Sequence, residues 1–156
     1  DKLVKGENYV ILPLYGKRKN EKFIFERSGL NQWNANGRKR DFGEIYIPIP
    51  AELHRKFPNF FPERDENFNL QIPTGEVFSA KVCQENSKAL MTNPNKALSD
   101  WLLRKVLQLK EGELATMEKL DKLGFDSVIL LKDENGNFKI DIMKTNTYSE
   151  FNNETE

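Results

Sequence analysis

The sequence predicts a mainly β domain in which about seven strands close into a small open barrel, with two or three short helices at its ends. Short apolar runs recur along the 156 residues, and several alternate apolar with polar side chains as half-buried strands do. Polar turns rich in Gly, Pro and Asn separate these runs. Antiparallel neighbours of this kind close most readily into a barrel.

Each expected strand follows from its own pattern. The run 9–15 and the run 23–26 are apolar and are separated by the polar turn 16–22. The segment 44–50 alternates, so Ile45, Ile47 and Ile49 share one face, and its prolines predict an edge strand. Further strands are expected at 67–73, 76–82 and 89–92. A hairpin is expected from 127–132 and 138–143 around the Asn135-Gly136 turn.

Three helices are expected, and each has a recognisable start or stop. Pro50 opens a short helix over 51–57, which Pro58 ends. The segment 93–109 carries an apolar stripe of Leu98, Trp101, Leu102 and Val106. The third helix, 117–123, is capped by Thr116 and ended by Gly124. The polar residues 145–156 are expected to form a frayed tail, which leaves one folded domain over 1–144.

Bulk properties restrict the class of protein. No apolar run is long enough to span a membrane, and no signal-peptide pattern is present. Cys83 is the only cysteine, which favours the cytoplasm. The chain begins at Asp1 without Met, so we expect it to be part of a longer protein. The formal net charge is zero, but residues 1–60 carry twelve Lys and Arg against seven Asp and Glu, and the remainder carries the opposite excess. One side of the domain is therefore expected to be basic, unless the imbalance is chance.

Familiar catalytic motifs are missing from this chain, so we expect it to be non-catalytic by itself and to need no metal or cofactor. His54 is the only histidine. His54 and Lys56 match half of the phospholipase-D motif, but Phe61 stands where its aspartate belongs. No acidic residue is followed two positions later by Lys, as a common metal-dependent nuclease core requires. Phosphate-binding Gly loops and nucleophile elbows are absent.

Two polar loops between strands carry the candidate binding residues. Asn and Gln pair with adenine, Arg and Lys with guanine, and acidic residues with cytosine. The loop 28–44 contains all of these types: Asn31, Gln32, Asn34, Asn36, Arg38, Lys39, Arg40, Asp41 and Glu44. The second loop, at 83–88, adds Gln84, Glu85, Asn86, Ser87 and Lys88, and Lys81 lies just before it.

These loops leave several functions open. Asn-Gly pairs are also ordinary turn residues, and Trp33 is expected either to contact a ligand or to cap the barrel. Asp41 and Glu44 are expected to read cytosine or to orient the Arg side chains. A protein-docking module would instead need an exposed apolar patch, for which the candidates are Phe60, Phe61, Tyr148 and Phe151. An RNA-binding sheet would need outward aromatic residues, whereas 67–73 shows Asn and Gln.

The chain also resembles a known family. The runs SGLNQWN, GRKRDFGEIYIPIP, FNLQIPTG, AKVCQENSKALMTNPNKALSDWLLRKVL and LATMEKLDKLGFDSVILLK are similar to the C-terminal domain of phospholipase-D-like restriction endonucleases of the NgoFVII and NgoAVII type. EIYIPIP and KALMTNPNKAL are the most specific of them. The resemblance covers about 9–143.

The resemblance implies a seven-stranded open DNA-binding pseudobarrel, similar to the plant B3 domain. It implies sequence-specific binding of double-stranded DNA by two arms in the major groove, around 28–44 and 81–88. The nuclease would be a separate N-terminal domain, and reading a palindrome would require a dimer. We expect phosphate contacts, which position the duplex without reading it, from Lys17, Arg18, Lys19, Arg55 and Lys56.

Overall fold

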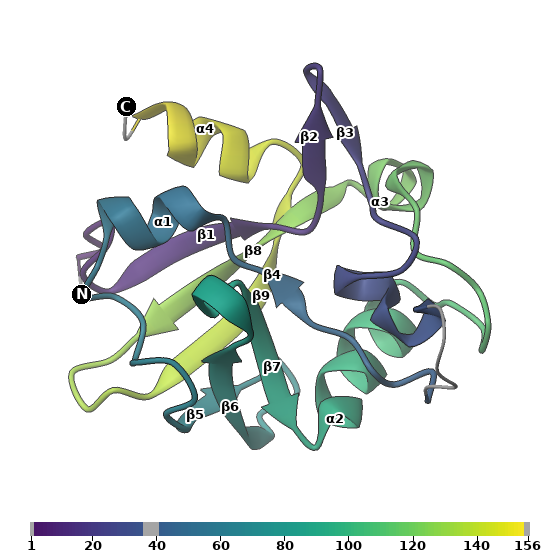
Figure 1. Cartoon of the computed structure of the whole chain (residues 1–156). Coiled ribbons are helices and arrows are strands. Elements are labelled where there is room, and N and C mark those ends of the chain that lie inside the picture. Colours follow the sequence, from purple (N-terminus) through teal and green to yellow (C-terminus); the bar gives the residue numbers. More distant parts are fainter. Residues whose placement is uncertain (1, 36–40, 155–156) are drawn as a thin grey trace.

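The computed structural model describes residues 2–35 and 41–154, and its main feature is a sheet of seven strands that nearly closes on itself (Figure 1). The strand order is β1-β8-β9-β5-β6-β7-β4. The two ends of this order, β1 and β4, contact each other. Pairing is antiparallel except between β5 and β9. The strands are β1 (Tyr9–Pro13), β4 (Ile47–Pro48), β5 (Phe68–Gln71), β6 (Val77–Cys83), β7 (Ala89–Asn93), β8 (Phe125–Lys132) and β9 (Phe138–Lys144). The predicted mainly β open barrel is confirmed.

The alternation of apolar residues places side chains in the core as expected. Ile45, Ile47 and Ile49 are at most 3% exposed, and Leu70 is fully buried between Phe68 and Ile72 on the inner face. The strand predicted over 44–50 is shorter than expected, because only Ile47–Pro48 pairs, with β7. Pro48 and Pro50 have no amide N–H to donate, so they limit the ladder at this edge.

Helices close the ends of the barrel. They are α1 (Ala51–Lys56), α2 (Asn95–Ser99), α3 (Met117–Leu123) and α4 (Thr147–Glu154). The hydroxyl of Thr116 accepts a hydrogen bond from the Lys119 amide and Gly124 has a left-handed φ of 85°, so the predicted ends of α3 are confirmed. The predicted helix 93–109 instead passes from α2 into a π-helix, η3 (Asp100–Val106). Its wider turns accompany three consecutive buried residues, Trp101 to Leu103.

Two segments differ from the sequence prediction. The polar turn expected at 16–22 is itself a hairpin, β2 (Gly16–Arg18) and β3 (Glu21–Phe23), which forms a separate sheet. The tail expected to fray forms α4, which packs on β1 and β8. Its anchor is Phe151, which is only 4% exposed, so burial of one large aromatic side chain holds an otherwise polar helix. Among the described residues, no helix is both long and apolar enough to span a membrane.

Candidate nucleic-acid interface

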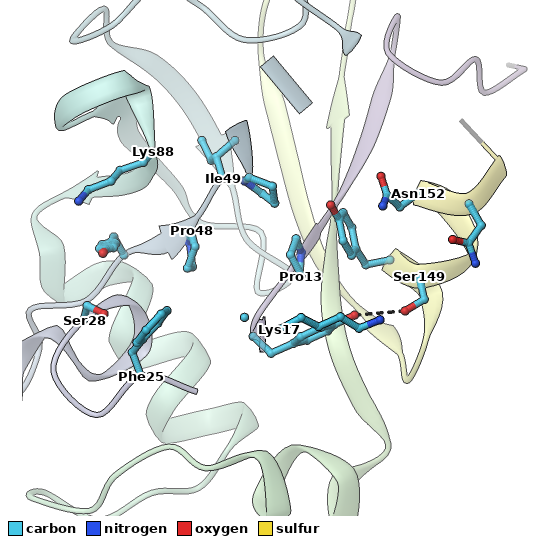
Figure 2. A pocket seen from close by; sticks show the side chains of 15 residues that line it. Pro13, Lys17, Phe25, Ser28, Pro48, Ile49, Lys88, Ser149 and Asn152 are labelled. Atoms are coloured by element: carbon cyan, nitrogen blue, oxygen red, sulfur yellow. Dashed lines mark hydrogen bonds between the residues drawn. The ribbon is translucent and has the colours of Figure 1, made fainter. Parts of the chain in front are cut away.

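A cavity of about 660 Å³ opens where five segments of the chain converge (Figure 2). Tyr15 and Lys17 reach it from the start of the β2–β3 hairpin, and Phe25 and Ser28 follow that hairpin in the chain. The other walls come from β4, from Lys88 beside β7, and from α4. Its described lining contains two lysines and no Asp or Glu, although 24 residues of the chain are acidic. Most of the other described lining residues are aromatic or aliphatic, so the cavity has an apolar wall with a basic edge.

The β2–β3 hairpin presents a basic tip beside the cavity. Lys17, Arg18 and Lys19 are exposed, and the turn residues Lys19 and Asn20 have φ values of 51° and 67°. Successive positive φ values are typical of a tight two-residue hairpin turn. The Arg18 guanidinium lies 4.6 Å from the centre of the Phe23 ring, which orients it along the hairpin. The predicted phosphate contacts at 17–19 thus lie on one rigid element next to the cavity.

A buried ion pair anchors this hairpin to the barrel. The Nζ of Lys22 donates to Asp126 at 2.7 Å and to the Oδ1 of Asn146 at 2.6 Å. Asp126 is fully buried and also accepts hydrogen bonds from the hydroxyl of Ser127 and the backbone amide of Asn146. One carboxylate therefore connects the hairpin to the residue that precedes α4. A buried pair of this kind specifies geometry more than it adds stability.

The second predicted loop has an unusual backbone. Gln84, Asn86 and Ser87 all have positive φ values, of 68°, 61° and 52°. Gln84 combines its φ with a ψ of 173°, a region that side chains other than glycine rarely occupy. The carbonyl of Ser87 accepts a hydrogen bond from the Nε2 of His54 at 2.8 Å, so His54 carries a proton on that nitrogen. Glu85, Asn86 and Lys88 remain exposed.

The first predicted arm is only partly described, and one of its residues has a different role. Asn36, Arg38, Lys39 and Arg40 lie outside the described residues. Asn31 is 1% exposed and donates to the carbonyls of Phe25 and Ala115, while it accepts from the Ala115 amide. Its side chain has no exposed edge for a base, so the predicted base contact by Asn31 is corrected to an internal brace.

The remaining described part of 28–44 packs over the helical end of the barrel. The Trp33 ring lies 4.5 Å from the Phe42 ring, which the Arg104 guanidinium covers at 3.6 Å. Of the two roles expected for Trp33, ligand contact or capping of the barrel, the structure therefore shows the capping role. The side-chain oxygen of Gln32 and the indole N–H of Trp33 are buried and have no hydrogen-bond partner among the described residues. Asn34 donates to the Glu26 carbonyl, Asp41 is exposed and Glu44 is half-buried. Ser28 is the one described residue of 28–44 that lines the cavity.

Three other predicted contacts lie away from the cavity lining. Lys81 forms a long, exposed ion pair of 3.8 Å with Asp65, an arrangement that contributes little to stability. Arg55 is exposed on α1. The Nζ of Lys56 donates to Asn152 of α4 at 3.3 Å. Within 2–35 and 41–154, no three His, Cys, Asp or Glu residues lie together as a metal site would require.

Two tyrosines in the cavity wall have raised pKa values. Loss of solvation raises the pKa of Tyr15, whose hydroxyl lies 3.3 Å from that of Ser149. Burial also raises the pKa of Tyr148, and the nearby Glu52 carboxylate, to which Tyr148 donates, raises it further. A phenol with an ordinary pKa is already neutral at physiological pH, so these shifts only extend the neutral range of both side chains to higher pH.

The seven-stranded open barrel carries a basic hairpin and a strained polar loop beside one cavity, and these features define the chain as a β-barrel binding domain. The family model of the NgoFVII C-terminal B3-like DNA-binding domain matches residues 6–134. The chain therefore belongs to this family of restriction-endonuclease DNA-binding domains, and DNA is its partner.

A solved structure is also similar to this chain. The hypothetical Arabidopsis thaliana protein At1g16640.1 is similar over 88% of this chain and 91% of its own, with 13% identity and a TM-score of 0.40. No curated protein matches the chain.

Sequence reasoning missed the aromatic and polar residues that complete the cavity. The sequence pattern placed Tyr15 and Phe25 in ordinary strands. In the structure the Phe25 side chain is 49% exposed. Ser149, Asn152 and Asn153 lie in the segment predicted to be a tail. The signal that was available is the spacing of Tyr148 and Phe151, which suits one face of a helix.

Proposed function

We propose that this chain is the target-recognition domain of a restriction endonuclease, and that it reads a short duplex sequence with two arms in the major groove. The arms are the segment 28–44, together with the β2–β3 hairpin that precedes it, and the loop 81–88. The proposal is carried by one observation: Lys17 and Lys88, which are 71 positions apart in sequence, line the same cavity, and none of its described lining residues is acidic. Family membership supplies the identity of the anion as DNA.

The roles follow from exposure and chemistry. Lys17, Arg18, Lys19 and Lys88 contact phosphates, which set the position of the duplex. Gln84 and Asn86 read bases, since their amides match adenine edges. The strained backbone of 84–88 fits this role, because such strain is found where a loop must present particular side chains. The polar residues of 28–44 apart from Asn31 extend the contact beyond the cavity.

The nuclease activity belongs to another domain of the same protein, which works in a bacterial cytoplasm and dimerises outside this chain. A protein-docking role is less well supported. Of the residues predicted for a docking patch, Phe60 and Phe151 are buried and Phe61 and Tyr148 are half-buried. They pack inside the domain and leave little surface for a partner.

The test is selection of a binding site from a random duplex pool, followed by titration of the enriched duplex against a scrambled one. We expect one motif, bound about a thousandfold more tightly than scrambled DNA at physiological salt. K17A and K88A should each weaken binding to all duplexes and lower the salt slope by about 1. K122A, which removes an exposed lysine of α3, is the matched control. Absence of enrichment would overturn the proposal.

A further inference from the structure

The C-terminal helix α4 forms a wall of the cavity that the two arms border. Tyr148, Ser149, Asn152 and Asn153 all line the cavity, and Figure 2 shows Ser149 and Asn152 across the cavity from Lys88 and Phe25. The match to the family model ends at residue 134, so α4 lies beyond it. Helix α4 belongs to neither of the two proposed arms.

The helix is held firmly enough to present a fixed face. Phe151 packs against the rings of Tyr9 and Phe57, with ring centres 5.8 Å and 6.0 Å away. Lys5 lies 5.1 Å from the centre of the Phe151 ring. The amide of Asn146, just before the helix, donates to the buried Asp126. These contacts fix both the position and the rotation of α4.

The cavity side of α4 is polar and uncharged. Residues three and four apart share a helix face, so Ser149, Asn152 and Asn153 form one uncharged polar strip. Glu150 is exposed and does not line the cavity, but it lies three residues before Asn153 and therefore borders this strip. Asn and Ser side chains commonly donate to phosphate and sugar oxygens of DNA. The polar side chains that α4 presents to the cavity are therefore of types that suit contact with a polyanion.

We infer that α4 is a third DNA-contacting element, and that Ser149 and Asn153 contact the sugar–phosphate backbone of the duplex held between the arms. This inference rests on the proposed function. It assigns α4 a positioning role, because phosphate contacts set the register of the duplex and carry no sequence information. The Lys22–Asp126–Asn146 contacts then connect the hairpin arm and α4 through one carboxylate.

The experiment compares a charge change on α4 with one on α3, in the full chain, on the duplex enriched by the wild type. N153K and E118Q each change the net charge by +1 at an exposed position, but only Asn153 lines the cavity, to which α3 contributes no described lining residue. N153K should tighten binding about three- to tenfold, as expected for one added charge a few ångströms from a phosphate near water. It should also steepen the salt slope by about 0.9. N153D, nearly the same shape, should weaken binding by a similar factor.

E118Q should change affinity by less than about twofold, since exposed charges farther than a Debye length, about 10 Å, from the duplex are screened. Equal effects of N153K and E118Q, in affinity and in salt slope, would overturn the role of α4 and leave the two-arm proposal intact. If the wild-type chain enriches no duplex, the proposed function itself fails, and α4 loses its role with it. If N153K and N153D unfold at the same urea concentration as the wild type, their effects on affinity arise at the DNA interface.

Discussion

Replacing Asn31 with alanine removes three hydrogen bonds that connect three parts of the chain. The side-chain nitrogen donates to the carbonyls of Phe25 and Ala115, and the side-chain oxygen accepts from the Ala115 amide, each at 2.9 Å. N31A leaves the amide and carbonyl of Ala115 buried without these partners, at about 1–3 kcal/mol each. The Phe25 carbonyl is only partly buried and adds less. We expect a total loss of about 4 kcal/mol.

The same segment supplies a matched control. Asn34 donates one hydrogen bond, to the exposed Glu26 carbonyl at 3.0 Å. N34A should therefore cost less than about 1 kcal/mol, since water replaces the lost partner. Urea unfolding followed by circular dichroism measures both variants. With a slope of about 2 kcal/mol/M, N31A should lower the midpoint by about 2 M and N34A by less than 0.5 M.

Two results would refute this reasoning. Equal midpoints for N31A and N34A would show that the buried brace contributes nothing. An N31A variant with wild-type stability and relaxed sequence discrimination would return Asn31 to the base-contact role that the sequence predicted. The affinity of N34A for the enriched duplex tests separately whether the surface of this segment contacts DNA.

Three further predictions concern the arms and the thiol. K22M leaves the fully buried Asp126 carboxylate without its cation, so it should lower the free energy of unfolding by about 3 kcal/mol. The control K17M removes an exposed lysine and should change this free energy little. Equal effects of the two variants in urea unfolding would contradict the anchoring role of Lys22. Q84G should raise the free energy of unfolding by about 1 kcal/mol, because glycine tolerates the backbone conformation of position 84. The same variant should weaken binding to the enriched duplex. A loss of stability in Q84G would show that the backbone is not strained there. Burial raises the pKa of the Cys83 thiol above the usual 9.0, so the folded state prefers the protonated thiol. The stability difference between wild type and C83A should thus be constant below pH 9.0 and should turn against the wild type as pH rises above it; a constant difference up to pH 10.5 would contradict the burial of the thiol.

Patterns within a few residues predicted the barrel well, because strand alternation depends only on neighbours in sequence. Ile45, Ile47 and Ile49 all face the core as their spacing required. The ends of α3 were predicted from Thr116 and Gly124, since capping is a local hydrogen-bonding matter. Composition also identified 16–22 and 84–88 as polar connections, and hence Lys17 and Lys88 as candidates.

Local patterns failed where a polar residue is used internally. Asn31 resembles its neighbour Asn34 in type and context, yet one is buried and the other is half-buried. The difference comes from Ala115, which is 84 positions away and supplies both a carbonyl and an amide. Likewise, α4 forms because Phe151 meets Tyr9 and Phe57. A helix of eight residues is too short to be stable on its own.

The sequence by itself therefore determined the fold class, the inward face of most strands, the family and the absence of familiar catalytic motifs. Only the tertiary structure decided which basic residues share a cavity, and that a polar C-terminal segment forms one of its walls. The physical reason is the range of the interactions. Alternation and capping act between near neighbours, whereas a cavity is made by side chains from segments that meet only when the barrel closes.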